Sequence, residues 1–439
     1  MLKHLLLKNV GPAPEMAVEF GPRINLITGD NGLGKSFLLD VSWWALTRKW
    51  PRDLNHSLTS GYLAKPSKIK LPATIEFSLT TKTKKTVKYT SKYSAADESW
   101  IGKAGRPWNP GLVIYAHADG SFSVWDPARN YWKQKDNIDV QDRLPGYVFS
   151  QQEVWDGLEV ELDSTKYVVC NGLLRDWSSW IKAGGTAAKN MAGVLKILSA
   201  SDRESDLLRP GPLTRIGIND ARDIPSIRTG YAESVPVLYA SSGVKRIVAL
   251  AYMFLWTWQE HLLAAKQLGD EPANQVVLLI DELESHLHPK WQRAILPALL
   301  KLAKVLHSSA QIQVITATHS PLVMASAETT FDSERDAWFD IDFHPNQQGG
   351  RVELLKRDFQ RLGDVSAWLT SEAFDLSAAR SLEAEIATQQ AMKLAETKNP
   401  SSTQVNQVDK LLKNALSDTD RFWVRWSAFK DSLGKQIKK

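Results

Sequence analysis

Eight residues, Gly29-Asp30-Asn31-Gly32-Leu33-Gly34-Lys35-Ser36, carry the strongest chemical signal in the sequence. They follow an apolar run at 24–28 and precede a run with helical spacing at 36–44. Glycines at such a junction let successive backbone N–H groups curl around phosphate oxygens, and the helix N-terminus adds its dipole. The lysine then reaches the terminal phosphates and the serine holds Mg²⁺. The spacing predicts a phosphate-binding loop for ATP and Mg²⁺, with contacts from Asn31, Gly32, Gly34, Lys35, Ser36 and Phe37.

Two carboxylates end a second apolar run, the Val-Val-Leu-Leu-Ile of residues 276–280. A buried strand of this kind delivers its last side chains to the edge of the sheet where ligands bind. We expect Asp281 to hold Mg²⁺, through water, and Glu282 to orient or deprotonate the attacking water. The alternative is a sheet edge with solvated acids, which the phosphate-binding loop disfavours.

A third motif, Ala240-Ser241-Ser242-Gly243-Val244-Lys245-Arg246, opens a long apolar helix about 40 residues before Asp281. Hydroxyl groups, N–H groups and a helix dipole at such a start can bind phosphate, or Ser241 can simply cap the helix. The segment resembles the signature motif of ABC-type ATPases, in the form of the SMC-, RecF- and OLD-like heads. It departs from the usual pattern at Ala240 and Val244. The resemblance implies that Ser241, Ser242 and Gly243 contact nucleotide.

A histidine, His319, follows the apolar segment at 312–316. It resembles the switch histidine of ABC-type ATPases, which senses the γ-phosphate and the water, whereas a lone histidine is otherwise often a core or turn residue. The resemblance also implies a glutamine ligand for Mg²⁺ and water. Gln151 and Gln152 both follow the apolar run at 147–149, and Gln151 is preferred. The expected catalytic residues are therefore Lys35, Glu282 and His319, and the expected metal ligands are Ser36, Asp281 and Gln151.

The segment 284–289, Glu-Ser-His-Leu-His-Pro, occupies the position of the D-loop, the turn by which ABC-type subunits touch each other. Its two histidines have no third ligand at a useful spacing, so a metal site there is disfavoured. ABC heads bind ATP between the phosphate-binding loop of one subunit and the signature of another. One set of motifs in one chain therefore implies a homodimer or higher homo-oligomer with two composite sites.

The elements around the motifs define the expected fold class, an α/β ABC-type P-loop ATPase head. We expect two lobes, a mixed sheet with an antiparallel β insertion, a helical insertion and a helical C-terminal tail. Residues 1–160 would form the first lobe, 161–235 the helical or linker insertion, 236–350 the second lobe and 351–439 the helical region. Segments 166–180 and 187–198 have helical spacing, and alternating residues at 71–93 indicate antiparallel strands.

The charge of the chain is concentrated in one stretch. The formal net charge of the 439 residues is +5, and residues 65–92 contain eight lysines and one acid. Such a stretch suggests non-specific contact with DNA phosphates, or else a solvated strand face. The single cysteine excludes an intrachain disulfide, and the apolar runs are too short for a signal peptide or a membrane crossing. We expect a cytoplasmic protein with no membrane contact.

Longer segments narrow the resemblance. They are LLIDELESHLHPKWQRAILPALL, ITATHSPLVMAS, YASSGVKRIVALAYMFLWTWQEH and WLTSEAFDLSAARSLEAE. Together they resemble the PtuA-like ATPases of Septu-type anti-phage defence and their retron-associated relatives. The resemblance implies a partner, a separately encoded HNH nuclease that the ATPase regulates. The alternative is a RecF-like ATPase clamp of DNA repair or recombination, with no nuclease partner.

Two further patterns leave alternatives open. Asp340 and Asp342 form a D-x-D, but the surrounding residues favour a hairpin with alternating exposed acids over a nuclease centre. Aromatic residues near the end of the chain recur at helical spacing and form either a packing face or a docking site for a partner: Phe422, Trp423, Trp426 and Phe429.

Overall fold

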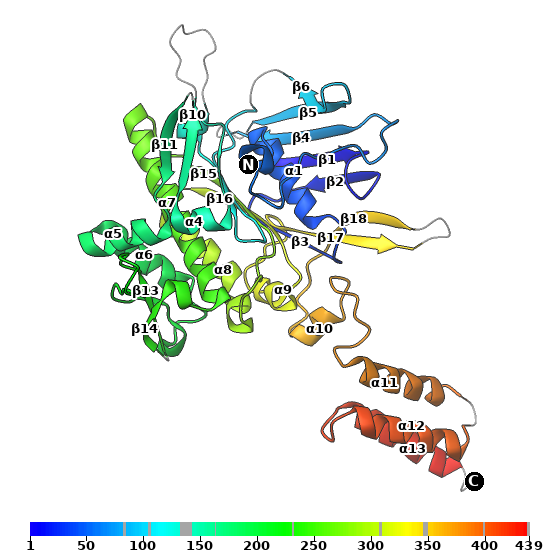
Figure 1. The fold of residues 1–439 in the computed structure, drawn as a ribbon. Coiled ribbons are helices and arrows are strands. Elements are labelled where there is room, and N and C mark those ends of the chain that lie inside the picture. Colours follow the sequence, from blue (N-terminus) through cyan, green and yellow to red (C-terminus); the bar gives the residue numbers. More distant parts are fainter. Residues whose placement is uncertain are drawn as a thin grey trace. The chain divides into compact units, whose positions relative to one another are not determined.

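The structure is a computed structural model (Figure 1) that describes residues 1–81, 85–103, 107–131, 143–162, 164–230, 232–306, 310–345, 350–397 and 400–436. The chain divides into two compact units, residues 1–365 and 366–439, which are described separately. The first unit contains the motifs identified above except the segment WLTSEAFDLSAARSLEAE, at 368–385, and the aromatic pattern near the end of the chain.

An eight-stranded mixed sheet in the order β18-β17-β3-β16-β15-β7-β8-β9 forms the centre of the first unit. Five neighbouring strands run parallel, and β18, β8 and β9 pair antiparallel at the two sides. The carboxyl ends of the parallel strands therefore meet at one edge, where open sheets bind ligands. The strands are β3 (Ile24–Gly29), β7 (Leu112–Ala116), β8 (Phe122–Trp125), β9 (Tyr147–Phe149), β15 (Gln275–Ile280), β16 (Gln311–Ala317), β17 (Ala337–His344) and β18 (Arg351–Arg357).

A five-stranded antiparallel sheet in the order β2-β1-β4-β5-β6 lies on the other side of helix α1 (Lys35–Thr47). Its strands are β1 (Leu2–Lys8), β2 (Glu15–Glu19), β4 (Thr74–Thr80), β5 (Thr86–Ser94) and β6 (Ser99–Gly102), and α2 (Pro51–Leu54) precedes β4. One apolar core joins both sheets to α1, and 11 of the 13 residues of α1 are buried. The alternating apolar and polar residues at 71–93 correspond to an antiparallel hairpin, β4–β5, as predicted.

The opposite face of the central sheet packs against α7 (Ser242–Leu268) and α8 (Pro289–Leu306). Side chains of β7, β15 and β16 alternate between this face and the α1 face, as the period of a strand requires. Leu112, Ile114, Val276, Leu278 and Ile312 meet Phe254 and Trp258 of α7 and Leu299 and Leu302 of α8. The sheet is thus covered on both sides, which accounts for the continuous apolar runs of its strands.

The chain between β8 and α7, together with the shorter connections, supplies the remaining elements of the unit. They are α3 (Pro127–Asn130), α4 (Gln151–Asp156), the hairpin β10 (Leu158–Leu162) and β11 (Thr165–Cys170), α5 (Leu173–Ala183), α6 (Thr186–Ile197), β12 (Arg209–Pro210), β13 (Ser226–Thr229), β14 (Ala232–Pro236) and, after β16, α9 (Pro321–Ala327). The prediction of a helix over 166–180 is wrong in its first part. β11 pairs with β10, and the helix begins only at Leu173, after Gly172.

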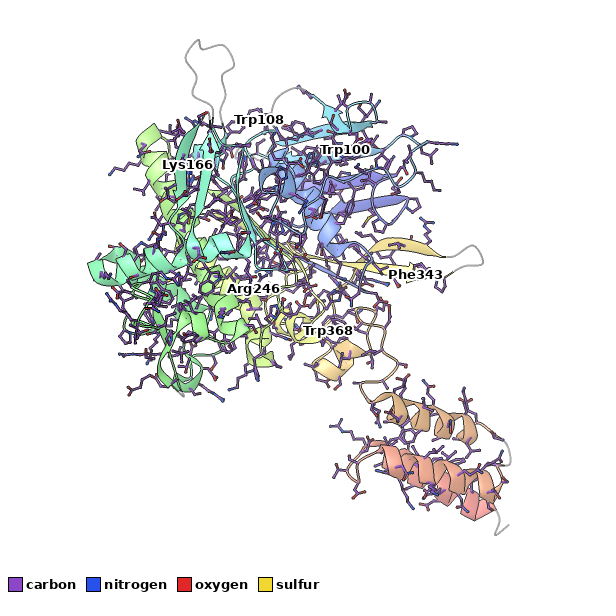
Figure 2. All side chains as sticks on the ribbon, in the orientation of Figure 1. Trp100, Trp108, Lys166, Arg246, Phe343 and Trp368 are labelled. Atoms are coloured by element: carbon purple, nitrogen blue, oxygen red, sulfur yellow. The ribbon has the colours of Figure 1, made fainter. Side chains whose placement is uncertain are left out.

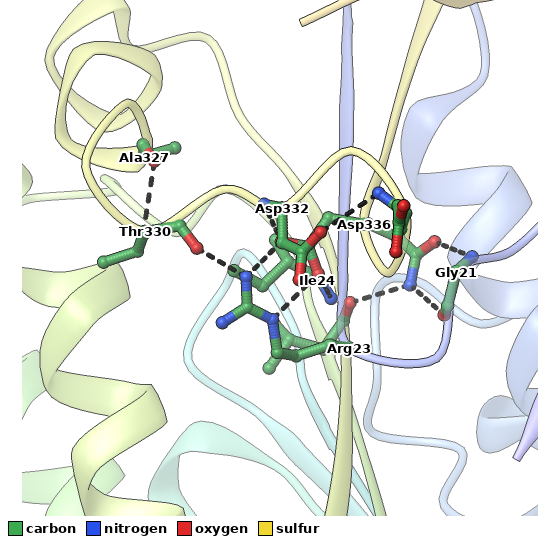
Figure 3. A network of polar contacts seen from close by, with 10 residues as sticks. Gly21, Arg23, Ile24, Ala327, Thr330, Asp332 and Asp336 are labelled. Carbon is green, nitrogen blue, oxygen red and sulfur yellow. Dashed lines mark hydrogen bonds and ion pairs between the residues drawn. The ribbon is translucent and has the colours of Figure 1, made fainter.

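A polar network fixes the start of β3, the strand that leads into the phosphate-binding loop (Figure 3). The Arg23 guanidinium donates to both carboxylate oxygens of Asp336 and to the Thr330 carbonyl. The Ile24 N–H donates to the same carboxylate at 3.0 Å, and the Asp332 N–H at 2.8 Å. Because Asp336 is buried and directly precedes β17, this network joins the first residues of β3 and β17.

The second unit contains α11 (Leu382–Ala395), α12 (Ser402–Ala415) and α13 (Phe422–Gln436); α10 (Val365–Leu369) stands at the boundary in the sequence. Trp426 is buried in its core, and Phe422, Trp423 and Phe429 pack against that core. The aromatic pattern is therefore a packing face. The expected boundary at residue 351 is wrong, because β18 pairs with β17 and belongs to the first unit.

In the same hairpin Asp340 is buried, contrary to the expectation of an exposed acid. It accepts a hydrogen bond from Thr28 at 2.8 Å and pairs with Arg357.

None of the helices in the described part of the chain has the length and apolar character that a membrane crossing requires.

Candidate nucleotide site

The phosphate-binding loop leaves β3 and enters α1 through backbone conformations that favour glycine. Gly29, Gly32 and Gly34 have φ angles of 133°, 80° and 102°. A Cβ at Gly29 would lie 2.2 Å from the Ile341 carbonyl oxygen, so no larger residue fits there. Gly34 is the N-cap of α1, and no described side chain caps that end. The first N–H groups of the helix are therefore available to an anion.

The loop residues divide into exposed and packed ones. Asn31, Gly32 and Ser36 are exposed, as ligand contacts require. Phe37 is half-buried, and its ring lies against Gly11 in the turn between β1 and β2. The Phe37 ring thus packs against the turn between β1 and β2, and its predicted contact with nucleotide stays a prediction.

The Lys35 ammonium lies inside the loop, where Nζ donates to the carbonyl oxygens of Gly29 at 2.8 Å and Asp30 at 2.7 Å. Burial lowers the pKa of Lys35, and the nearby carboxylates of Asp281, Asp30 and Glu282 oppose that shift. The structure thus brings the lysine of the loop and the two acids that follow β15 to the same edge of the sheet, as the sequence predicts.

The turn after β15 is fixed by both neighbouring strands. The Asp281 N–H donates to the Ala116 carbonyl of β7 at 2.9 Å, and the Leu283 N–H donates to the Ala317 carbonyl of β16 at 3.3 Å. Glu282, between them, has a φ of 47°, in the left-handed region that non-glycine residues rarely adopt. This backbone directs Asp281 and Glu282 differently, so each can have its own role.

Asp281 has the features of a ligand for a divalent cation. It is buried, and its Oδ1 has no hydrogen-bond partner among the described residues. Burial raises the pKa of Asp281 to about 6, and a hydrogen bond with Ser36 opposes that shift. An orphaned carboxylate oxygen beside a serine hydroxyl and a lysine fits Mg²⁺ bound together with phosphate. Among the described residues no group of three or more His, Cys, Asp or Glu side chains could hold a metal ion. His286 and His288 are therefore not part of such a group.

His319 lies in the loop after β16, at the same edge of the sheet. The Thr318 N–H donates to the Ile27 carbonyl at the end of β3 at 3.0 Å, which ties this loop to the strand that leads into the phosphate-binding loop. Burial lowers the pKa of His319, the charge of Lys35 lowers it further, and Glu282 opposes the shift. His319 therefore shares the electrostatic environment of Lys35 and Glu282 and favours its neutral form.

Two carboxylates that the sequence did not single out complete the edge. Glu284 accepts from the Thr318 hydroxyl at 2.6 Å and from the His319 N–H, so it holds the histidine loop. Asp40, one turn after Ser36 in α1, is buried and accepts from the Tyr115 hydroxyl at 3.0 Å. Burial raises the pKa of Asp40 to about 7. A helical offset of four from Ser36 was the available signal for Asp40, whereas Glu284 stood in the D-loop segment and nothing local marked its contact with the His319 loop.

The signature residues form the start of α7. The Ser241 side chain caps the helix by accepting from the Val244 N–H at 3.4 Å, and Ser241 and Ser242 are exposed. Gly243 is buried against the D-loop segment, where an added Cβ would lie 2.6 Å from the His286 carbonyl oxygen. No hydrogen bond or ion pair of the described residues joins Ser241, Ser242 or Gly243 to the phosphate-binding loop of the same chain.

Gln151 and Gln152 begin α4 and are both exposed. Gln151 lies against Gly120 and lines a cavity with Ser242 and Arg246. Among the described residues no contact joins Gln151 to Ser36 or Asp281. The structure therefore groups this glutamine with the start of α7, and its predicted role as a metal ligand stays a prediction.

The phosphate-binding loop, the paired acids after β15 and the histidine after β16 define a P-loop ATPase with a mixed α/β fold. The family described as "AAA domain, putative AbiEii toxin, Type IV TA system" matches residues 24–325, and the chain belongs to this family.

The chain is similar to three curated proteins, two retron ATPases and a Septu protein. It is 37% identical over 145 residues to the "Retron Ec83 probable ATPase" of Escherichia coli, with 33% of this chain and 22% of that protein aligned. It is 32% identical over 114 residues to the "Retron Vc95 probable ATPase" of Vibrio cholerae serotype O1 biovar El Tor, with 26% and 19% aligned. It is 30% identical over 154 residues to the "Septu protein PtuA" of Bacillus mycoides, with 33% and 20% aligned. The aligned segments span about a fifth of these relatives. The expected resemblance to retron and Septu ATPases is confirmed.

Solved structures with similar chains include SMC heads and RecF. An SMC head bound to the C-terminal winged-helix domain of ScpA aligns over 81% of this chain and 98% of its own, with 15% identity and a TM-score of 0.40. The SMC head of Thermotoga maritima aligns over 81% and 99%, with 16% identity and a TM-score of 0.37. The recombination mediator RecF aligns over 81% and 98%, with 15% identity and a TM-score of 0.36.

Proposed function

We propose that this protein is an Mg²⁺-dependent ATPase of an anti-phage defence system that assembles through ATP and regulates a separately encoded HNH nuclease. The observation that carries the proposal is the convergence of Lys35, Asp281, Glu282 and His319 at one edge of the sheet. The similarity to retron and Septu proteins supports the assignment to defence. The nuclease partner rests on the resemblance to PtuA-like ATPases alone.

Each residue of the site has a role that its surroundings support. The free N–H groups at the start of α1 and the Lys35 ammonium bind the phosphates, and Ser36 and Asp281 hold Mg²⁺, which neutralises phosphate charge. Glu282 accepts the proton of the attacking water, and the neutral His319 orients that water. Catalysis then depends on positioning and on charges fixed before the reaction, because the turn after β15 and the loop after β16 are both held by backbone hydrogen bonds.

Assembly is proposed because no hydrogen bond or ion pair of the described residues joins Ser241, Ser242 or Gly243 to the phosphate-binding loop of the same chain. In the proposed homodimer Ser241, Ser242 and Gly243 of one copy cover the nucleotide of the other. Two variants test this. Lys35→Ala should abolish nucleotide binding, whereas Glu282→Gln should retain binding, lose turnover and accumulate an ATP-dependent dimer in sedimentation velocity. Turnover of Glu282→Gln at the wild-type rate would contradict the proposed base.

The nuclease partner is tested by co-expression with the neighbouring gene. The proposal is supported if the two proteins form a complex of defined mass and if this complex cleaves DNA at different rates with and without ATP. ATP turnover that rises with gapped duplex DNA and needs no partner instead supports a RecF-like clamp.

DNA contact is proposed through the lysine-rich stretch, residues 65–92. Lys88 and Lys92 are exposed on the same face of β5, and Lys85 is exposed before it, whereas Lys82 and Lys84 lie outside the described residues. Lysines on alternate strand positions suit contact with phosphates without reading bases. The double variant Lys88→Glu/Lys92→Glu should weaken DNA binding and reduce its dependence on salt. Lys266→Glu, on an exposed position of α7, is the control, and equal affinity of all three proteins would contradict the contact.

A further inference from the structure

A groove with a cavity of about 410 Å³ lies between the hairpin β10–β11 and the C-terminal end of α7 (Figure 1). We call it the hairpin groove. Its lining includes Tyr167 and Val168 of β11, Leu268 of α7 and two arginines, Arg129 and Arg143. No acidic side chain of the described residues lines it. The groove therefore combines apolar walls with positive charge.

Three of the apolar side chains that line the hairpin groove are open to solvent. Tyr167, Val168 and Leu268 are 48%, 61% and 46% exposed. Single exposed apolar side chains are ordinary, but several around one concave surface mark a site of association. The groove thus has the apolar centre that a protein interface requires.

The hairpin that forms one wall is an incomplete sheet. In the described part of the chain β10 and β11 pair only with each other, and the first four residues of β11 are exposed. Lys166, labelled in Figure 2, is one of these four. An isolated pair of strands is marginally stable and leaves backbone N–H and C=O groups open along its outer edges. Such a hairpin gains stability when another surface covers it.

The two arginines of the groove differ in how far they are already paired. Arg129 stacks over the Tyr147 ring, 4.1 Å from its centroid, and lies 3.6 Å from a carboxylate oxygen of Glu260. Arg143 is exposed, and its Nη1 donates to the Ala128 carbonyl at 3.1 Å. No carboxylate among the described residues forms an ion pair with Arg143. Arg143 is therefore the cation that the groove offers to a partner.

A matching carboxylate lies on the same hairpin. Glu159 of β10 is exposed, forms no ion pair with the described residues and lies directly opposite Val168, at the border of the apolar patch. The other exposed acid of β10, Glu161, lies opposite Lys166, which offsets its charge. The chain thus contains both halves of a complementary contact, Arg143 and Glu159, on either side of one apolar patch.

We propose that the hairpin groove is an interface with a second copy of this chain. Around a two-fold axis each hairpin covers the groove of the other copy, and Arg143 of each copy pairs with Glu159 of the other. Such an interface is self-complementary, because every contact occurs twice. It needs no nucleotide and therefore goes beyond the ATP-dependent dimer of the proposed function. With two different faces for assembly, the chain can form species larger than a dimer.

The first test measures the association without nucleotide. In sedimentation equilibrium the wild type should be in a monomer–dimer equilibrium. Arg143→Glu and Glu159→Arg should each weaken the dimer at least about tenfold, because each reversal brings like charges together twice. The double variant Arg143→Glu/Glu159→Arg restores opposite charges and should bring the dissociation constant back to within about threefold of the wild-type value. Arg228→Glu, which reverses an exposed cation on β13, is the control and should dimerise as the wild type does.

The second test separates this interface from the ATP-dependent one. Lys35→Ala, which lacks nucleotide binding, should keep the nucleotide-free association. Glu282→Gln with ATP should form species larger than a dimer at concentrations where the nucleotide-free protein is dimeric. Adding Arg143→Glu to Glu282→Gln should leave only the ATP-dependent dimer.

The outcomes keep this inference apart from the proposed function. A wild-type protein that stays monomeric without nucleotide up to about 100 μM overturns the interface. A dimer that both charge reversals leave intact, or that the double variant fails to restore, overturns the pairing of Arg143 with Glu159. Absence of ATP turnover and of ATP-dependent assembly would overturn the proposed function, and the nucleotide-free measurement still decides the interface. Thermal unfolding within a few degrees of wild type confirms that each variant folds.

Discussion

Glu284 holds the histidine loop, and its removal should therefore reduce turnover without reducing nucleotide binding. The carboxylate accepts from the Thr318 hydroxyl at 2.6 Å and from the His319 N–H, and Thr318 is buried. Glu284→Ala leaves both donors without an acceptor, at about 1–3 kcal/mol each. If about 3 kcal/mol of this hydrogen-bond energy serves to position His319 against the attacking water in the transition state, its loss lowers turnover about 100-fold, since about 1.4 kcal/mol corresponds to a tenfold change in rate.

Phosphate release at saturating ATP measures this effect, and a fluorescent ATP analogue measures binding. Glu284→Gln should be intermediate, because its amide oxygen can accept one of the two hydrogen bonds. Glu334→Ala, which removes an exposed carboxylate elsewhere in the same unit, is the matched control. Turnover of Glu284→Ala within twofold of wild type, in a protein that unfolds at the same temperature, would refute the role given to Glu284.

Three further predictions concern the packing around the site. Gly243→Ala places a Cβ 2.6 Å from the His286 carbonyl oxygen and should reduce turnover at least about tenfold with unchanged ATP affinity, as measured by phosphate release and analogue binding. Asp40 has a pKa of about 7, raised by burial, so its stabilising effect is full below about pH 4 and is lost as the pH rises through 7. The unfolding free energy of wild type should therefore fall, relative to Asp40→Asn, by about 1 kcal/mol per pH unit between pH 5 and 7 and then level off; a constant difference in urea unfolding would contradict this. Asp336→Ala leaves Arg23 unpaired beside a buried site and should cost about 3 kcal/mol in unfolding free energy, and a loss below 1 kcal/mol would show that the network of Figure 3 contributes little.

Residues whose roles depend on their spacing to near neighbours in the chain could be predicted from the sequence. The loop from Gly29 to Ser36 was recognisable because its glycines, lysine and serine lie within eight positions, between a strand and a helix. Asp281 and Glu282 were recognisable because a buried strand must end where its apolar run ends. The error over residues 166–180 has a related cause: the run of apolar residues there is short, so its spacing alone does not distinguish a strand from a helix. Four of the six residues of β11 are β-branched or aromatic, and its pairing with β10 makes it a strand.

The sequence by itself determined the class of this protein, since phosphate binding by a loop, a strand and a helix depends on residues that are neighbours in the chain. Tertiary structure alone decided which side chains support that chemistry. Glu284 reaches the backbone of His319 across 35 positions. Such a contact depends on the order of strands in the sheet, and no local pattern encodes that order. The physical reason is that burial and an orphaned carboxylate oxygen, which mark Asp281, exist only after distant segments have packed together.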